Sequence, residues 1–247
     1  MSYRIVSIDD FPDLESELEP LTYAVWPEFM LQDPVAFKYW SRLFSDFSMY
    51  QLALLEGDTL VGAGNSIPFA WDGAVDDLPD GGWDWAFDRA IQDVDAGRQP
   101  QTLVGLQIMI APSHQRKGLS CDFIKALKET AARHKLKRLI IPVRPTLKHK
   151  YPLTSIERYI TWQDNDGLPF DPWLRVHVRA GARIVKACSR SMVISRSVAD
   201  WQEWTGLVFP ESGRYIVPQA LVPVEINREE DRGIYIEPNV WVEHQVG

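Results

Sequence analysis

Six residues, Gln115 to Ser120 (QRKGLS), place two cations and a glycine between an apolar run and a segment with helical spacing. Apolar residues recur at helical intervals from Gly118 to His134, which predicts a helix beginning at this turn. The free backbone N–H groups at a helix start favour an anion, and the helix dipole adds to that preference. Gly118 has no side chain, so an anion can approach the backbone closely. The stretch therefore predicts a phosphate-binding turn.

Positive charge is concentrated around this turn. Residues 111 to 150 hold eleven Lys or Arg and two acids, whereas the whole chain has a formal net charge of −8. The acidic remainder would repel a long polyanion, so the block favours a compact phosphate ligand over nucleic acid. A solvated helix face is the alternative explanation. For Arg144, Lys148 and Lys150, near the end of the block, the two alternatives are contacts with the phosphates of the ligand and a solvated basic edge.

The turn resembles the acyl-CoA pyrophosphate loop of the GNAT superfamily of N-acetyltransferases, Q/R-x-x-G-x-G/A, which also lies between a strand and a helix. Ser120 departs from the usual Gly or Ala, but it is still small. The resemblance implies an acyl-CoA, expected to be acetyl-CoA, as co-substrate, and direct transfer to an amine without a covalent enzyme intermediate. It implies that CoA contacts the strand end Ile108, Met109 and Ile110, and the loop residues Gln115, Arg116, Lys117, Gly118, Leu119 and Ser120.

A second segment, WLRVHVRAGARIV from Trp173 to Val185, resembles the family's helix-to-strand stretch. There an aromatic residue, often a tyrosine that protonates the departing CoA thiolate, stands four positions before a Gly-Phe pair. The equivalent residue here is His177, because Gly181 follows four positions later. Histidine can donate a proton near neutral pH, so the resemblance implies His177 as the general acid. The alternatives are a purely packing role for His177 and proton donation by Tyr159.

Two features of the family are missing from the sequence. Many members carry a glutamate on the strand before the loop, acting as a general base through water, but TLVGLQIMI has no carboxylate. The asparagine that often follows the next strand is also absent, and PVRPTLKHKYP stands there instead. A base must then come from elsewhere, and the sequence leaves five candidates open: His114, His149, Glu157, Asp164 and Asp166.

The elements that must position these residues alternate between strand and helix in the middle of the chain. We expect strands at 3–8, 50–71 (two, with a turn at 56–58), 101–112, 137–143 and 182–194, and further extended segments at 213–226 and 233–244. Helices are expected at 13–47, broken near Pro27 and Pro34, and near 83–97, 118–134 and 171–181. This order predicts an α/β fold with a mixed sheet flanked by helices. It is similar to the GNAT arrangement, with insertions and a C-terminal β extension.

Composition limits the remaining possibilities. The 247 residues and 45% hydrophobic content predict one domain, with a core at about 1–195 and an extension at about 196–247. No apolar run is long enough to cross a bilayer, and the two cysteines form no framework, so we expect a cytoplasmic protein without a membrane or nucleic-acid partner. No metal motif is apparent, and a homodimer is possible.

The acceptor is expected to be a small-molecule amine. Four acids in the insertion between 72 and 99, namely Asp76, Asp77, Asp80 and Asp84, are consistent with a cationic acceptor or with a solvated loop. The missing strand glutamate and asparagine leave one alternative function, a catalytically inactive acyl-CoA-binding sensor or regulatory module. Release of CoA thiol with some amine would distinguish the enzyme from the module.

Overall fold

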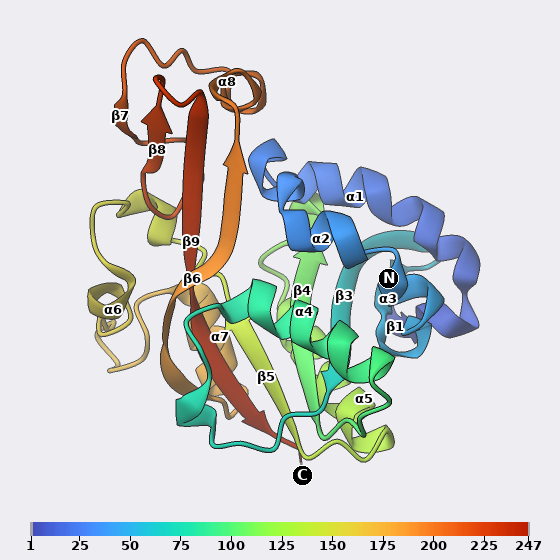
Figure 1. The fold of residues 1–247 in the computed structure, drawn as a ribbon. Coiled ribbons are helices and arrows are strands. Elements are labelled where there is room, and N and C mark those ends of the chain that lie inside the picture. Colours follow the sequence, from blue (N-terminus) through green and yellow to red (C-terminus); the bar gives the residue numbers. More distant parts are fainter. Residues whose placement is uncertain (1, 247) are drawn as a thin grey trace.

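The computed structural model describes residues 2 to 246, and its strands form one nine-stranded mixed sheet (Figure 1). The strands are β1 (Tyr3–Ser7), β2 (Leu52–Glu56), β3 (Thr59–Phe69), β4 (Thr102–Ile110), β5 (Arg138–Val143), β6 (Arg183–Arg196), β7 (Gly213–Tyr215), β8 (Val224–Asn227) and β9 (Arg232–Gln245). Their order is β1-β2-β3-β4-β5-β9-β8-β7, and β6 also pairs with β9. β4 and β5 are parallel, whereas the other pairs are antiparallel. The predicted mixed α/β class is confirmed.

Eight α-helices, together with short 3₁₀ turns, surround this sheet within residues 2–246. They are α1 (Leu18–Val25), α2 (Pro34–Tyr39), α3 (Arg42–Ser45), α4 (Gly82–Asp95), α5 (Leu119–Arg133), α6 (Ile156–Tyr159), α7 (Pro172–Arg179) and α8 (Val198–Thr205). Proline at the first helical position sets the start of α2 and α7. In each case the preceding aspartate, Asp33 or Asp171, accepts hydrogen bonds from two backbone N–H groups of the first turn. The helix α6 lies between 144 and 170, where the sequence predicted neither a helix nor a strand.

Helices cover both faces of the sheet. Leu18 and Leu21 of α1 pack in one buried cluster with Ala63 and Met109. Neighbouring residues on β3 face the other way, and there Phe123 of α5 lies over the strand. A Cβ added at Gly64 would lie 2.8 Å from the Phe123 ring, so glycine allows this close approach. The close packing fixes α5, and with it the preceding loop, against the centre of the sheet.

The C-terminal strand β9 lies in the middle of the sheet. It pairs with β5 from Arg138↔Gln245 to Val143↔Val240, and with β6 along most of its length. Figure 1 shows β9 passing between β5 and β6 and continuing into the smaller arm formed with β7, β8 and α8. The segment after residue 195 therefore supplies the strand that joins β5 to β6, two strands of the expected core. The sequence could not place β9, since an extended pattern does not specify its pairing partner.

Candidate active site

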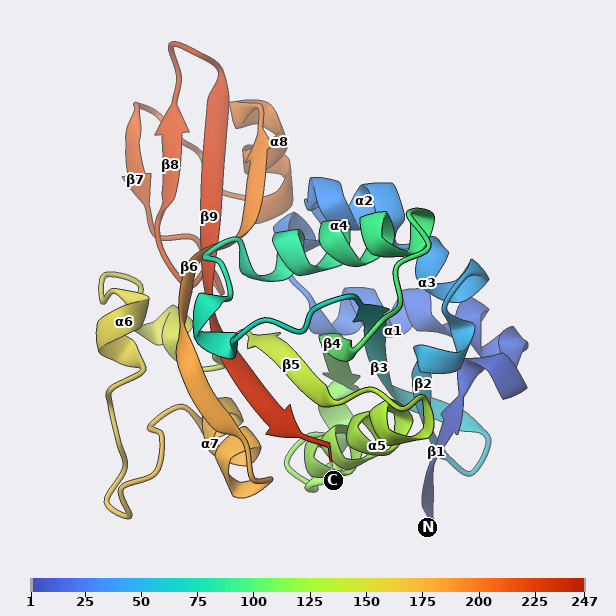
Figure 2. The same cartoon turned by 60° about the horizontal axis from the view of Figure 1, so that its bottom comes forward.

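A gap opens between the two parallel strands at the centre of the sheet. β4 and β5 pair only from Thr102↔Arg138 to Val104↔Ile140, and beyond this point the strands diverge (Figures 1 and 2). A register shift against β3 falls between Asn65 and Ser66, which leaves Leu106 as an extra residue on β4. Such a bulge redirects local backbone groups. The second half of β4 thus presents backbone N–H and C=O groups toward the gap.

The predicted turn follows β4 directly and leads into α5. Gly118 is the residue before the helix and has a left-handed φ of +83°, which glycine adopts without strain. A Cβ added there would meet nothing within 4 Å, so the space beside the helix start is open. Arg116 also has a positive φ, +65°. Gln115 Nε2 donates to the Ile110 carbonyl over 3.1 Å, which ties the turn to the end of β4.

The other residues expected to contact CoA differ in exposure. Arg116 and Lys117 are exposed, and Lys117 Nζ lies 3.0 Å from the Tyr3 hydroxyl. Leu119 and Met109 are buried, and Met109 packs on the α1 side of the sheet. Only the backbone of Met109 is therefore available on the gap side. Partly buried positions are occupied by Ile108, Ile110 and Ser120.

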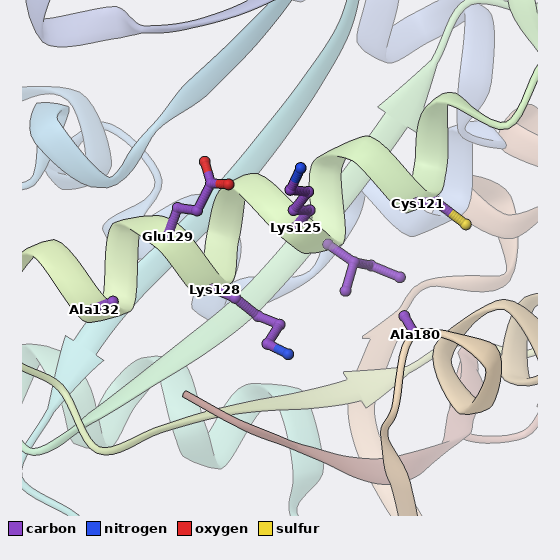
Figure 3. Close-up of a pocket in the computed structure, with 7 residues that line it drawn as sticks. Cys121, Lys125, Lys128, Glu129, Ala132 and Ala180 are labelled. Atoms are coloured by element: carbon purple, nitrogen blue, oxygen red, sulfur yellow. The ribbon is translucent and has the colours of Figure 1, made fainter. Parts of the chain in front are cut away.

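A groove of about 500 Å³ runs along α5 toward the end of α7 (Figure 3). Its lining residues are Cys121, Ile124, Lys125, Lys128, Glu129, Ala132 and Ala180. Figure 3 shows Ala180 facing the α5 residues from the end of α7. The groove carries two lysines and one glutamate, so its charge suits an anionic ligand. Its first lining residue, Cys121, lies in the first turn of α5, three residues after Gly118.

His177 is fully buried and faces β9. Its Nδ1 lies 2.9 Å from His244 Nε2, and its ring packs edge-on against Trp173. Burial lowers the pKa of His177 well below its usual value, and the nearby His244 lowers it further. His244 pairs with Leu139, which in turn pairs with Leu103. His177 therefore lies beside the part of β4 and β5 that is still paired.

Tyr159 is bonded to Asp171 at the start of α7. Its hydroxyl donates to Asp171 Oδ2 over 2.9 Å, and its pKa is raised by burial and by the neighbouring carboxylate. Asp171 also accepts from the backbone N–H of Leu147, Trp173 and Leu174. The Asp171 carboxylate thus connects the segment after β5 to α7 by hydrogen bonds, and the Tyr159 hydroxyl is one of the donors.

Two of the basic residues considered for CoA have internal partners instead. Lys148 is fully buried and donates to the carbonyls of Tyr151 and Leu221 at 2.9 and 2.7 Å, while Arg144 Nε donates to Glu237 at 2.8 Å. Burial lowers the pKa of Lys148 to about 8. Neither residue belongs to a solvated basic edge, as one of our alternatives proposed, and Lys150 alone of the three is exposed.

The five candidate bases do not gather at the gap. His114 lies 3.2 Å from Glu56, Asp164 forms an ion pair with Arg175, and His149 Nδ1 contacts the Thr146 carbonyl. Glu157, in α6, and Asp166, between α6 and α7, are both exposed. A different set of carboxyl groups, those of Asp33, Asp84 and Glu237, comes together from three distant segments. This cluster of three was not predicted from the sequence. Of these, only Asp84 belonged to the acidic cluster noted in the insertion.

Comparison with known proteins supports the expected family. No protein-family model matches the chain. Arginine N-acetyltransferase avaD from Aspergillus versicolor is 34% identical over 251 residues, covering 90% of this chain and 86% of that protein. The chain belongs to the GNAT superfamily of N-acetyltransferases.

The GNAT fold also appears in solved structures with low sequence identity. The loading GNATL domain of CurA from Lyngbya majuscula has a TM-score of 0.61 at 18% identity, covering 100% of this chain and 98% of that one. The GphF GNAT-like decarboxylase, in complex with isobutyryl-CoA, has a TM-score of 0.57 at 15% identity and covers 100% of both chains. These two structures establish the fold.

This GNAT enzyme is an acyl-CoA-dependent N-acetyltransferase that acts on an amine of a small molecule. Nothing in the comparisons supports the inactive binding module. Among residues 2–246, no helix combines the length and apolar character needed to span a bilayer. The residues around the turn fit an acyl-CoA, because the open space at Gly118 adjoins the exposed Arg116 and Lys117.

Proposed function

We propose that this GNAT enzyme transfers the acetyl group of acetyl-CoA to an amine of arginine or of a closely similar cationic molecule. The main support for this proposal is the 34% identity to an arginine N-acetyltransferase over 90% of the chain. Asp33 and Asp84 each have one buried carboxyl oxygen without a hydrogen-bond partner within residues 2–246, and these two oxygens also support a cationic acceptor. Placement in the cytoplasm, the absence of a nucleic-acid partner and a homodimer stay predictions.

The CoA part of the proposal rests on three adjoining features. The phosphates would meet the backbone at Gly118 and the charges of Arg116 and Lys117. The pantetheine would run beside β4 from Gly105 to Ile110, where β4 lacks pairing with β5. A backbone N–H near the Leu106 bulge would polarise the thioester carbonyl and stabilise the oxyanion that forms. The groove along α5 would accommodate the rest of the nucleotide.

Proton transfer must accompany the reaction at two points. The acceptor amine must lose a proton before it attacks the thioester carbon, and the leaving thiolate must gain one. His177 and Tyr159 stay predictions for the second step. The hydrogen bonds that occupy them, to His244 and Asp171, support the alternative that both residues mainly stabilise the fold.

The test is CoA thiol release from acetyl-CoA, with L-arginine among a panel of amines that includes lysine, ornithine and agmatine. Mass spectrometry would identify the acetylated nitrogen, and isobutyryl-CoA would report on the acyl preference. We expect the highest kcat/KM for arginine or another guanidine-bearing amine with acetyl-CoA. Turnover confined to uncharged amines would contradict the acceptor class, and binding of CoA without thiol release for every amine would contradict the enzyme itself.

A further inference from the structure

Three carboxyl groups meet inside the molecule where α2, α4 and β9 come together. Asp33 precedes α2, Asp84 lies in the first turn of α4, and Glu237 lies in β9. Asp33 and Glu237 are fully buried, and Asp84 is partly exposed with its Oδ1 covered. Both views of the fold show α2 lying beside α4 (Figures 1 and 2). The cluster therefore joins segments that are far apart in sequence.

Of the three carboxyl groups, Glu237 alone has a cation partner among residues 2–246. It accepts hydrogen bonds from Arg144 Nε at 2.8 Å, from the Tyr235 hydroxyl at 2.9 Å and from Asn239 Nδ2 at 3.1 Å. Asp33 Oδ1 accepts only from the backbone N–H of Val35 and Ala36. Arg144 thus pairs with Glu237, and neither aspartate forms an ion pair within the part of the chain that the structure describes.

One oxygen of each aspartate is left over. Asp84 Oδ2 accepts from the Val193 N–H at 3.0 Å, but Asp84 Oδ1 and Asp33 Oδ2 are both buried without a donor among residues 2–246. The two carboxyl groups lie within hydrogen-bonding range of each other. Two carboxylates in contact cannot both be ionised without a cation, so the empty pair holds one proton between these oxygens.

The environment of the pair agrees with a shared proton. Burial, together with the negative charges of Asp33 and Glu237, raises the pKa of Asp84 to about 9, although the hydrogen bond from the Val193 N–H opposes this shift. Burial also raises the pKa of Asp33. Glu237, with its partners Arg144 and Tyr235, is the other ionisable group acting on both aspartates. A buried acidic pair is costly to maintain, and a cation would relieve that cost.

The pair is close to the gap between the strands. Trp83, the neighbour of Asp84 in the first turn of α4, donates from Nε1 to the Leu106 carbonyl at 2.8 Å. Leu106 is the bulged residue on the open half of β4. On the other side, Arg144 follows directly after β5 and connects to Glu237. The cluster thus lies where the carboxyl ends of two parallel strands separate, a common position for ligands.

We propose that Asp33 and Asp84 determine acceptor specificity by binding the guanidinium group of the acceptor, which replaces the shared proton. The inference rests on the proposed function, an arginine-like acceptor. The guanidinium presents several N–H donors in a planar fork, and the pair offers two free oxygens. On binding, the Asp84 carboxyl releases its proton to solvent. The single positive charge of the guanidinium replaces that of the proton, so the net charge of the cluster is unchanged.

Titration calorimetry with L-arginine, in the presence of CoA, tests this exchange. At pH 8 the experiment is repeated in buffers of different ionisation enthalpy, which reveals the protons released. We expect close to one proton per arginine bound, because the pair is still protonated below the Asp84 pKa of about 9. Arginine binding without proton release would overturn the proposal.

Two variants test the same exchange by kinetics. Asparagine resembles a protonated aspartate, so Asp84→Asn and Asp33→Asn should keep the empty site intact, and Asn also caps a helix well. We expect the KM for arginine to rise roughly 10- to 150-fold, the range for a hydrogen bond to a charged group, with CoA affinity unchanged. Proton release on arginine binding should be lost in Asp84→Asn, which removes the carboxyl group that carries the proton. Asp88→Asn, one turn further along α4, is the matched control, because Asp88 bonds to Tyr39 outside the pair.

Citrulline separates this inference from the proposed function. It replaces the guanidinium by a neutral urea of similar shape, so the native enzyme should prefer arginine and Asp84→Asn should narrow that preference. If the native enzyme acetylates arginine but the variants keep its KM and preference, the pair is not the guanidinium site and only this inference fails. If arginine neither binds nor reacts while another amine does, both the acceptor class and this inference fail.

Discussion

Two buried pairs of titratable side chains respond to pH in opposite directions. Burial lowers the pKa of His177 and brings that of His244 to about 4, so both rings are neutral in the folded protein. Their contribution to stability is present above the ordinary histidine pKa of 6.5 and is lost as pH falls toward 4. The raised pKa of Asp84 works the other way, because stability is lost as pH rises toward 9. The histidine pair should therefore limit stability in acid.

The variant His177→Phe tests this role at the residue scale. It leaves His244 Nε2 without its partner, so we expect a loss of about 1–3 kcal/mol in the free energy of unfolding at pH 7.5. As pH falls from 6.5 to 5, the native protein should lose up to about 1.4 kcal/mol per pH unit more than the variant, because the variant has one buried neutral histidine fewer. Urea unfolding at several pH values measures both quantities.

Turnover of the same variant separates packing from catalysis. Because His177 lies beside the paired part of β4 and β5, we expect kcat to stay within a few-fold of the native value. A fall of about 100-fold with unchanged CoA affinity, partly restored by His177→Tyr, would instead establish His177 as the proton donor. Tyr159→Phe is the companion variant, since it removes the other candidate hydroxyl and leaves the ring in place.

At the scale of elements, the junction of β4 and α5 creates the strongest candidate for CoA binding. The left-handed residue Gly118 ends the loop, and α5 is held by Phe123 over the glycines of β3. The helix start is therefore fixed in position while its surroundings stay open. This combination is what a multiply charged phosphate group requires.

The variant Gly118→Val should weaken CoA binding by at least tenfold with the fold retained. A β-branched residue is strained at a φ of +83°, at a cost of roughly 1–2 kcal/mol, and its side chain would fill the open space at the helix start. Gly57→Val is the matched control, because Gly57 has a φ of +62°, also meets nothing within 4 Å and lies in the β2–β3 turn. Calorimetric titration with CoA compares them, and equal affinity in both variants would contradict the loop assignment.

Sequence patterns predicted these local elements but not the acidic cluster. The strand-turn-helix around Gly118 is set by residues close in sequence, and both its helix and its glycine could be identified directly. Asp33 was expected only within a broken helical region, and Glu237 only within an extended segment. Their meeting depends on how α2, α4 and β9 pack, which no short pattern encodes. The surroundings of His177 also depend on packing, because its partner His244 lies on β9.

At the scale of the whole molecule, β9 connects the strands beside the proposed CoA site, β4 and β5, to β6 and β8. It pairs with β5 along the whole length of β5, and it is the strand with which β6 pairs. It also contributes the buried side chains of Tyr235, Glu237 and Trp241. Trp241 also donates from Nε1 to the Pro79 carbonyl at 2.8 Å, which fixes the chain just before α4. The last strand in the sequence therefore helps to position segments on both sides of the gap.

A chain that ends at Arg196 should fail to fold, although it contains every segment of the expected core. Without β9, β5 is left with only its short pairing to β4, and β6 has no partner within residues 2–246. Unpaired buried backbone groups and the lost apolar contacts of Trp241 and Tyr235 together exceed the 5–15 kcal/mol that typically stabilises a domain. We expect circular dichroism to show no cooperative unfolding transition. A chain that ends at Gln245 keeps all β9 pairings and is the control, so a cooperative transition in the shorter chain would show that β9 is dispensable.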